Sequence, residues 1–172
     1  GATAGITVAG GNGLGSAANQ LKGPLGVAID VSGNIYVADG WNNRVQKWIP
    51  GATSGTTVAG GNGQGAAANQ FNLPSKVAID LNGNIFVADY YNNRVQKWSP
   101  GAISGITVAG GNGAGSAANQ LNKAAGVALD VAGNIYVADR DNNRVQKWVS
   151  GATSGSTVAG GSGAGFASNQ LN

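Results

Sequence analysis

The stretch GNIYVADGWNNRVQKW, at Gly33–Trp48, decides the fold because the chain contains it three times in nearly the same form. The second copy reads GNIFVADYYNNRVQKW at Gly83–Trp98, and the third reads GNIYVADRDNNRVQKW at Gly133–Trp148. Each copy starts 50 residues after the one before it, with no insertion or deletion between them. A fixed internal period of this kind is typical of proteins in which each repeat forms one supersecondary unit.

The repeat extends over the whole chain of 172 residues. We divide the chain into units at 1–50, 51–100 and 101–150 with a partial fourth at 151–172, and treat 1–172 as one repeat segment. The short sequence TVAGG occurs in all four units, whereas the other segments that alternate in hydrophobicity occur three times. One TVAGG copy is therefore surplus, and we take it to be the last one, Thr157–Gly161.

Each complete unit contains four short segments with the alternating apolar pattern of β-strands. In the first unit they are Gly26–Asp30, Asn34–Asp39, Arg44–Ile49 and Ile6–Gly11. Gly33 lies in the tight turn between the first two, where a positive φ is needed. Four short strands in a unit of this length predict an all-β fold, a β-propeller built of four-stranded antiparallel blades. Blades must stack because one such sheet cannot bury both of its faces.

The composition argues against catalysis, because the side chains that most often perform it are missing. The chain has no His and no Cys, and its seven acidic residues are all Asp. A Ser nucleophile would have no base, and no thiolate or imidazole could bind a metal. We therefore predict no enzyme activity, no catalytic residue, no metal site and no cofactor. The net charge of +3 is too small to indicate nucleic-acid binding by itself.

The Gly-rich segment GGNGLGSAANQ, residues 10–20, could be mistaken for a phosphate-binding loop. A true loop of that kind needs a Lys-Ser/Thr pair and a following helix, and neither is present. The segment recurs in every unit, so we interpret it as a connection between blades. No stretch approaches 18 apolar residues, so we expect no transmembrane helix and no membrane partner.

The stretch GVAIDVSGNIYVADGWNNRVQKW resembles the NHL repeat. The matching residues of the first unit are Val27, Asp30, Gly33, Asn34, Ile35, Tyr36, Val37, Asp39, Asn43, Arg44 and Val45. The other two units match at the same positions, with Phe86 in place of Tyr. The departures are mild: Ala124 stands where the other units have Pro, and Lys76 stands where they have Gly. The resemblance implies a propeller, often one of six blades.

The resemblance also implies that a recurring Asp, Asn and Arg tie the blades together. These structural residues are Asp39, Asn43, Arg44, Asp89, Asn93, Arg94, Asp139, Asn143 and Arg144. The alternative is a ring of metal or ligand contacts. Some similar propellers are lyases that rely on histidines, which this chain lacks.

The positions at which the three units differ most are the candidates for a ligand-binding face. Chemically distinctive side chains gather in the loop between the second and third strands: Trp41, Tyr90, Tyr91, Arg140 and Asp141. A second variable set precedes the first strand, at 22–25, 72–75 and 122–125. In a propeller both loops open on the same face, so we expect a recognition surface for a protein or peptide. Drift at exposed loops is the alternative.

Three blades cannot close a ring, because known propellers use typically four to eight. We therefore expect a homo-oligomer, with two chains giving six blades, that acts as a non-catalytic scaffold or protein-interaction module. Thr157–Gly161 is expected to pair with the partner chain or to displace its Thr7–Gly11. The chain itself would be a fragment or an engineered product; a natural origin would indicate a secreted or cell-surface bacterial protein.

Two alternatives remain for the function. The first is a propeller that binds single-stranded RNA, since Arg44, Lys47 and Trp48 combine base and aromatic in each unit. Packing between sheets explains Trp48 equally well, so nucleic acid is not the expected partner. The second is a segment of a longer extracellular repeat array.

Overall fold

The computed structural model describes residues 4–171, which form twelve strands in three antiparallel sheets. In each sheet the strands lie side by side in chain order. The first sheet contains β1 (Pro24–Ile29), β2 (Ile35–Asp39), β3 (Arg44–Trp48) and β4 (Thr56–Gly60). The second contains β5 (Pro74–Ile79), β6 (Ile85–Asp89), β7 (Arg94–Trp98) and β8 (Ile106–Gly110). The third contains β9 (Ala124–Leu129), β10 (Ile135–Asp139), β11 (Arg144–Trp148) and β12 (Ser156–Gly160).

One turn of 3₁₀ helix separates the second and third strands of each sheet. These turns are η1 (Gly40–Asn42), η2 (Tyr90–Asn92) and η3 (Arg140–Asn142). Each ends at an Asn in the left-handed region, with φ of 51°, 53° and 51°. Asn tolerates this backbone better than other non-glycine residues, which explains the recurring Asn at this point of the repeat. The described part of the chain contains no helix with the length and apolar character needed to cross a membrane.

The predicted all-β fold is confirmed, but the blades are offset from the sequence units. The fourth strand of each sheet comes from the unit that follows, so β4 belongs to the second unit. The prediction that Ile6–Gly11 forms a strand is wrong, because no described strand pairs with it. The prediction that Thr157–Gly161 is surplus is also wrong, because Ser156–Gly160 is β12 and pairs with β11 of the same chain. The surplus copy lies at the N-terminal end.

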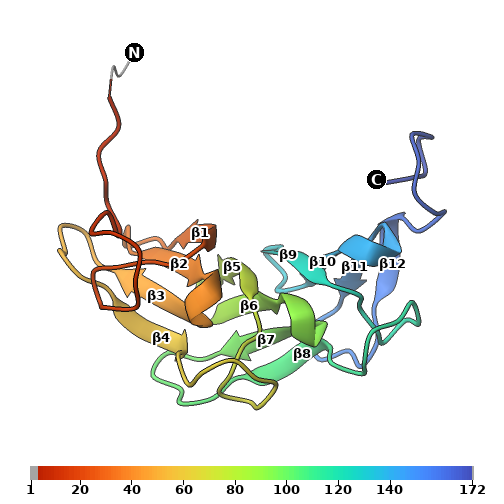
Figure 1. Cartoon of the computed structure of the whole chain (residues 1–172). Coiled ribbons are helices and arrows are strands. Elements are labelled where there is room, and N and C mark those ends of the chain that lie inside the picture. Colours follow the sequence, from red (N-terminus) through yellow and green to blue (C-terminus); the bar gives the residue numbers. More distant parts are fainter. Residues whose placement is uncertain (1–3, 172) are drawn as a thin grey trace.

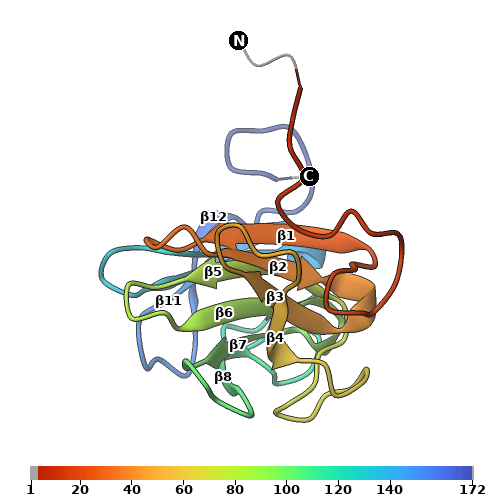
Figure 2. The same cartoon turned by 90° about the vertical axis from the view of Figure 1, so that its left-hand side faces the viewer.

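The three sheets stand next to one another in an arc, with β1, β5 and β9 nearest its concave side (Figure 1). Figure 2 shows the N-terminal segment and the C-terminal loop leaving the sheets on the same side. The apolar core lies between the sheets. Val45 and Ala59 of the first sheet pack with Val77, Val87 and Trp98 of the second. An equivalent core joins the second and third sheets.

The first strands of neighbouring blades approach closely because Gly26 has no side chain. A Cβ at this position would lie 2.7 Å from the carbonyl oxygen of Ser75 and 2.8 Å from the Cα of Lys76. Both distances are shorter than real carbon contacts, so β1 and β5 pack backbone against backbone. This contact sets the inner edge of the arc.

Candidate functional site

A buried ion pair fixes the connection that enters each blade. Asp39 ends β2 and faces Arg44 at the start of β3, with 2.8 Å between Oδ2 and Nε. Arg44 also donates from Nη1 to the carbonyl of Ser16 at 2.8 Å, and from Nη2 to those of Ala17 and Gln20 at 3.0 Å. One side chain thus holds most of the preceding loop.

The same arrangement recurs in the other two blades. The corresponding ion pairs are Asp89–Arg94 at 2.8 Å and Asp139–Arg144 at 2.7 Å. Burial raises the pKa of Asp89, while hydrogen bonds from Asn72, Asn92 and Arg94 oppose that rise. These carboxylates are fully buried and already accept several protein hydrogen bonds.

The recurring Asn at the end of each 3₁₀ turn joins one blade to the next. The Oδ1 of Asn43 accepts a hydrogen bond from the backbone N–H of Leu73 at 3.0 Å. Asn93 accepts one from the N–H of Lys123 at 2.8 Å. Leu73 and Lys123 both have a φ of 59°, so these bonds hold a left-handed backbone in place. Asn43 and Asn93 thus reach the following blade, whereas each Asp–Arg pair holds the loop that enters its own blade.

The two variable loops of each blade lie against each other. Trp41 donates its backbone N–H to the carbonyl of Lys22 at 3.1 Å, and Tyr91 does the same to Asn72 at 3.1 Å. In the third blade the equivalent bond runs from Asp141 to Asn122 at 3.1 Å. The side chains that distinguish the units are thereby collected on one end of the blades.

On the first blade, this end presents an aromatic ring with a cation beside it. Trp41 is 61% exposed, and the Nζ of Lys22 lies 5.9 Å from the ring centroid. Gly23 makes room for the indole, since a Cβ there would lie 2.9 Å from Trp41. A cation at this distance is attracted by the ring face, so the two side chains form one composite surface.

On the second and third blades, the variable side chains touch one another. Tyr90 and Tyr91 pack edge to face with centroids 4.9 Å apart, and Tyr91 is 54% exposed. Arg140 donates from Nη1 to the hydroxyl of Tyr90. Asp141 forms an ion pair with Lys123 at 2.7 Å, which raises the pKa of that lysine. All five predicted ligand-face residues thus lie at the same end of their blades.

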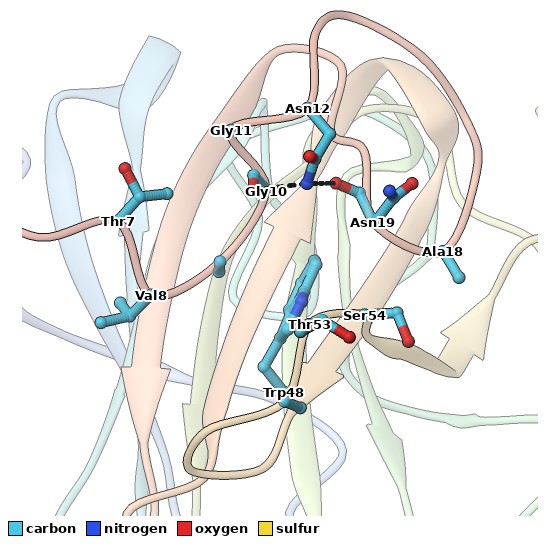
Figure 3. Close-up of a pocket in the computed structure, with 12 residues that line it drawn as sticks. Thr7, Val8, Gly10, Gly11, Asn12, Ala18, Asn19, Trp48, Thr53 and Ser54 are labelled. Carbon is cyan, nitrogen blue, oxygen red and sulfur yellow. Dashed lines mark hydrogen bonds between the residues drawn. The ribbon is translucent and has the colours of Figure 1, made fainter.

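A second feature, which sequence reasoning missed, is a cavity beside the buried tryptophan of each blade. The first has a volume of about 580 Å³ and is lined by Thr7, Asn12, Asn19, Trp48 and Thr53, among others (Figure 3). The equivalents beside Trp98 and Trp148 measure about 340 and 640 Å³. Their walls come from two different units, so no single repeat contains the signal.

These cavities contain small polar side chains and no acid–base pair.

Trp48 is only 1% exposed, and Arg44 is buried as well, so the Arg44, Lys47 and Trp48 combination presents no stacking surface for RNA bases. Within residues 4–171, no three side chains of the His, Cys, Asp or Glu type gather as a metal site would require.

The family model of the NHL repeat matches residues 21–48, 71–98 and 121–148. The chain contains three NHL repeats. Each match ends at the buried Trp and so covers the first three strands of a blade, while the fourth strand and the Gly-rich connection lie between matches. No curated protein sequence matches the chain.

Solved structures share the fold of these NHL repeats at low identity. A streptogramin B lyase is 13% identical, with a TM-score of 0.54 over 73% of this chain and 37% of the lyase chain. A chain of a nidogen/laminin complex is 21% identical, with a TM-score of 0.61 over 79% and 48%. A protein of unknown function from Bacteroides thetaiotaomicron VPI-5482 is 18% identical, with a TM-score of 0.63 over 80% and 36%. The chain thus spans less than half of each, and the likeness shows the fold alone.

Proposed function

We propose that this NHL-repeat chain is a non-catalytic interaction module that binds a protein or peptide on the face formed by its variable loops. The observation that carries the proposal is the separation of constant from variable residues. The Asp and Arg that repeat in every blade, together with Asn43 and Asn93, make hydrogen bonds within the scaffold. The residues that change between blades are brought together by backbone hydrogen bonds at one end.

The chemistry of this face favours an acidic partner with an apolar anchor. Trp41 and Tyr91 offer exposed aromatic surface, which is enriched where proteins bind one another. Lys22 and Arg140 add positive charge around them. The one acidic side chain among these loops, Asp141, is already paired with Lys123. The face therefore has an excess of cations, which steers an acidic segment toward it.

The absence of catalysis rests on the site chemistry. The cavities and the variable face contain no His, Cys or Glu, because the sequence has none. The likeness to the streptogramin B lyase is 13% in sequence and speaks for the fold alone. A binding role needs none of the missing groups.

Selection of peptides from a random displayed library on the immobilised chain tests this proposal. We expect acidic peptides with an aromatic or aliphatic residue to be enriched. Trp41→Ala should raise the dissociation constant of a selected peptide by at least about tenfold, because a buried aromatic anchor contributes on the order of 2 kcal/mol to binding. Tyr91→Ala and Arg140→Ala should have smaller effects in the same direction.

The matched control is Leu81→Ser, an exposed residue in the β5–β6 hairpin at the opposite end of the blade. This change should leave both the fold and the peptide affinity as they were. Selected peptides that bind Trp41→Ala, Tyr91→Ala and Arg140→Ala as tightly as the original chain would overturn the proposal. Retention of a single-stranded oligouridylate at physiological salt, with no peptide selected, would favour the RNA alternative instead.

A further inference from the structure

The first blade exposes a surface that the other two blades bury. Val27 is 53% exposed, whereas its counterparts Val77 and Val127 are 1% and 6% exposed. Pro24 and Ile29 are also more exposed than the residues 50 positions later. We term Pro24, Val27 and Ile29 the leading face. Its apolar side chains lack the preceding blade that covers their counterparts.

The third blade exposes the opposite surface. Ala138 and Ala159 are exposed, although their counterparts in the first and second blades are buried. Leu171 is 39% exposed, whereas Phe71 and Leu121 are 0% exposed. We term Ala138, Ala159 and Leu171 the trailing face. A cavity of about 540 Å³ lies there, lined in part by Ala138 and Leu171.

The chain itself shows that a trailing face and a leading face fit together. Ala59 of the first blade packs in one core with Val77 of the second. Ala109 of the second blade packs in the same way with Val127 of the third. We infer that a second copy of this chain docks its leading face on the trailing face, and that its segment Ile6–Gly10 replaces β12 as the outer strand of the third blade.

The N-terminal segment already has the left-handed glycine that ends an outer strand. Among the described residues it has no ladder partner, yet Gly10 has a φ of 70°. The glycines that end β4, β8 and β12 are Gly60, Gly110 and Gly160, with φ of 69°, 68° and 67°. The segment therefore needs little rearrangement to pair with a strand, which lowers the ordering cost of association.

Two similar segments compete for one place in this assembly. If the second copy docks as β5–β8 dock on β1–β4, its residues 6–21 coincide with residues 156–171 of the first copy. Residues 16–20 of the incoming copy are held by its own Arg44. No described arginine donates to the corresponding C-terminal carbonyls. The anchored copy arrives with its blade, so the unanchored β12 segment is the one displaced.

Gln146 on β11 lacks the hydrogen bond that its counterpart in the first blade has. In the first blade, the Oε1 of Gln46 accepts a hydrogen bond from Thr57 at 2.9 Å. Gln146 is buried, and neither its Oε1 nor its Nε2 finds a partner in the described structure, although Thr157 lies opposite in β12. A buried amide without partners costs free energy.

The side chain of Asn143 is a second group that the docked copy would contact. Asn43 and Asn93 accept the backbone N–H of Leu73 and Lys123 in the following blade. Among residues 4–171, no blade follows the third, so none offers the equivalent backbone donor to Asn143. Gly23 of the second copy occupies that place when its first blade docks. Two such junctions join the arcs of two copies into a ring of six blades, and the rigid-body cost of association is incurred only once.

A disulfide test distinguishes the two competing strands, because the chain has no cysteine of its own. Facing residues of an antiparallel pair have Cα atoms about 4.5–5.5 Å apart, within reach of a disulfide. The double variant Thr7→Cys and Gln146→Cys reports on a second copy. The double variant Gln146→Cys and Thr157→Cys reports on β12 of the same chain. The pair Gln96→Cys and Thr107→Cys, inside the second blade, is the control for geometry and folding.

We expect the first double variant to give a covalent species of two chains, and the wild-type chain to sediment at about twice 16.9 kDa. The control should form its disulfide within one chain. The inference is overturned if the Thr7 variant stays uncrosslinked while the Thr157 variant closes within one chain. Covalent species of three or more chains would contradict the two-copy ring, and a wild-type monomer of 16.9 kDa would contradict it even if a variant failed to fold. None of these outcomes depends on the peptide-binding face.

Discussion

The two end copies of the TVAGG segment share most of their sequence and differ in structure. Residues 6–22 read ITVAGGNGLGSAANQLK, and residues 156–172 read STVAGGSGAGFASNQLN. The C-terminal copy forms strand β12, but within residues 4–171 no arginine anchors its loop. The N-terminal copy has no ladder partner in the same part of the chain, yet Arg44 fixes its loop. Each copy thus has one half of the contacts that the internal copies have in full.

The difference shows that the Gly-rich loop forms from local sequence, whereas the outer strand needs a neighbouring strand. The loop keeps its shape in both copies, because Gln20 and Gln170 donate to the carbonyls of Asn12 and Ser162 at 3.0 and 3.3 Å. Gly15 is required there, since a Cβ would lie 2.0 Å from the Oε1 of Gln20. The strand has no such internal bonds, so it forms only where β3, β7 or β11 offers an edge.

Removing the anchor of the N-terminal copy should have the largest effect. Arg44→Met leaves Asp39 buried without its cation, so we expect the free energy of unfolding to fall by about 3–5 kcal/mol. Denaturant unfolding measures this loss. Hydrogen exchange at Ser16–Gln20 should rise toward the rate of the C-terminal copy. Ser32→Ala, which copies the residue of the third unit, is the control and should change stability by less than about 0.5 kcal/mol. Unchanged exchange at Ser16–Gln20 would mean that Arg44 is not what distinguishes the copies.

Adding one methyl group to each copy should show which of them is held against a strand. A Cβ at Gly160 would lie 2.3 Å from the carbonyl oxygen of Asn143, whereas at Gly10 the nearest atom is Leu21 Cδ1 at 3.0 Å. Both have positive φ, so each change to Ala costs about 1–2 kcal/mol of backbone strain. In the single chain, at a concentration too low for a second copy to dock, Gly160→Ala should cost roughly 1–3 kcal/mol more, because backbone cannot move aside easily. Equal losses in thermal or chemical unfolding would contradict the comparison.

Exchanging the first residue of the two copies should have a smaller effect. Ser156→Ile places a β-branched residue in β12, and the gain in stability should reach at most about 1 kcal/mol. The reciprocal change Ile6→Ser lies outside any described ladder and should leave the stability unaltered at concentrations where the chain is monomeric. Hydrogen exchange of the β11 and β12 amides measures the first effect. A larger loss from Ile6→Ser would show that the N-terminal copy is already paired in solution.

The smallest effect concerns the Asn–Asp hydrogen bonds of the hairpins, which should be the same in the first and third blades. In the β1–β2 and β9–β10 hairpins, Asn34 and Asn134 donate to Asp30 and Asp130 and hold the pKa of both below the ordinary 3.8. Because the folded pKa is lowered, these bonds stabilise the fold above that value and are lost as the pH falls through the lowered pKa. Carboxyl NMR titration should give similar values for both. Asn34→Ala should raise the pKa of Asp30 and leave Asp130 unchanged, and a shift at both would reveal coupling between the blades.

Much of the fold could be predicted from the sequence because the period-two pattern marks strands directly. The three strands from Gly26 to Trp48 were placed nearly as they occur. The fourth was assigned to the wrong blade, because a repeat has no natural starting point and either TVAGG copy fits the pattern. The lengths of the connections would have given the correct assignment. Seven residues separate Trp48 from Thr56, which suits neighbouring strands of one sheet, whereas a long loop follows Gly10.

The sequence indicated which residues form the candidate face, but not how their side chains contact one another. Variation between units indicated Trp41, Tyr91 and Arg140, because exposed loop residues are free to change. The edge-to-face packing of Tyr90 on Tyr91 and the bond from Arg140 to Tyr90 depend on the angle between blades, which no repeat specifies alone. The cavities beside the buried tryptophans were missed for the same reason.

The offset between sequence units and blades has a consequence for how such genes grow. Each blade takes three strands from one unit and one from the next. Duplication or loss of a 50-residue unit by recombination therefore recreates every junction between blades unchanged, wherever the crossover falls. Length can vary by whole blades while the packing of each blade stays as it was. Because the three units are so alike in sequence, a crossover between them keeps the register of the repeat, so the number of blades can change without a new kind of junction.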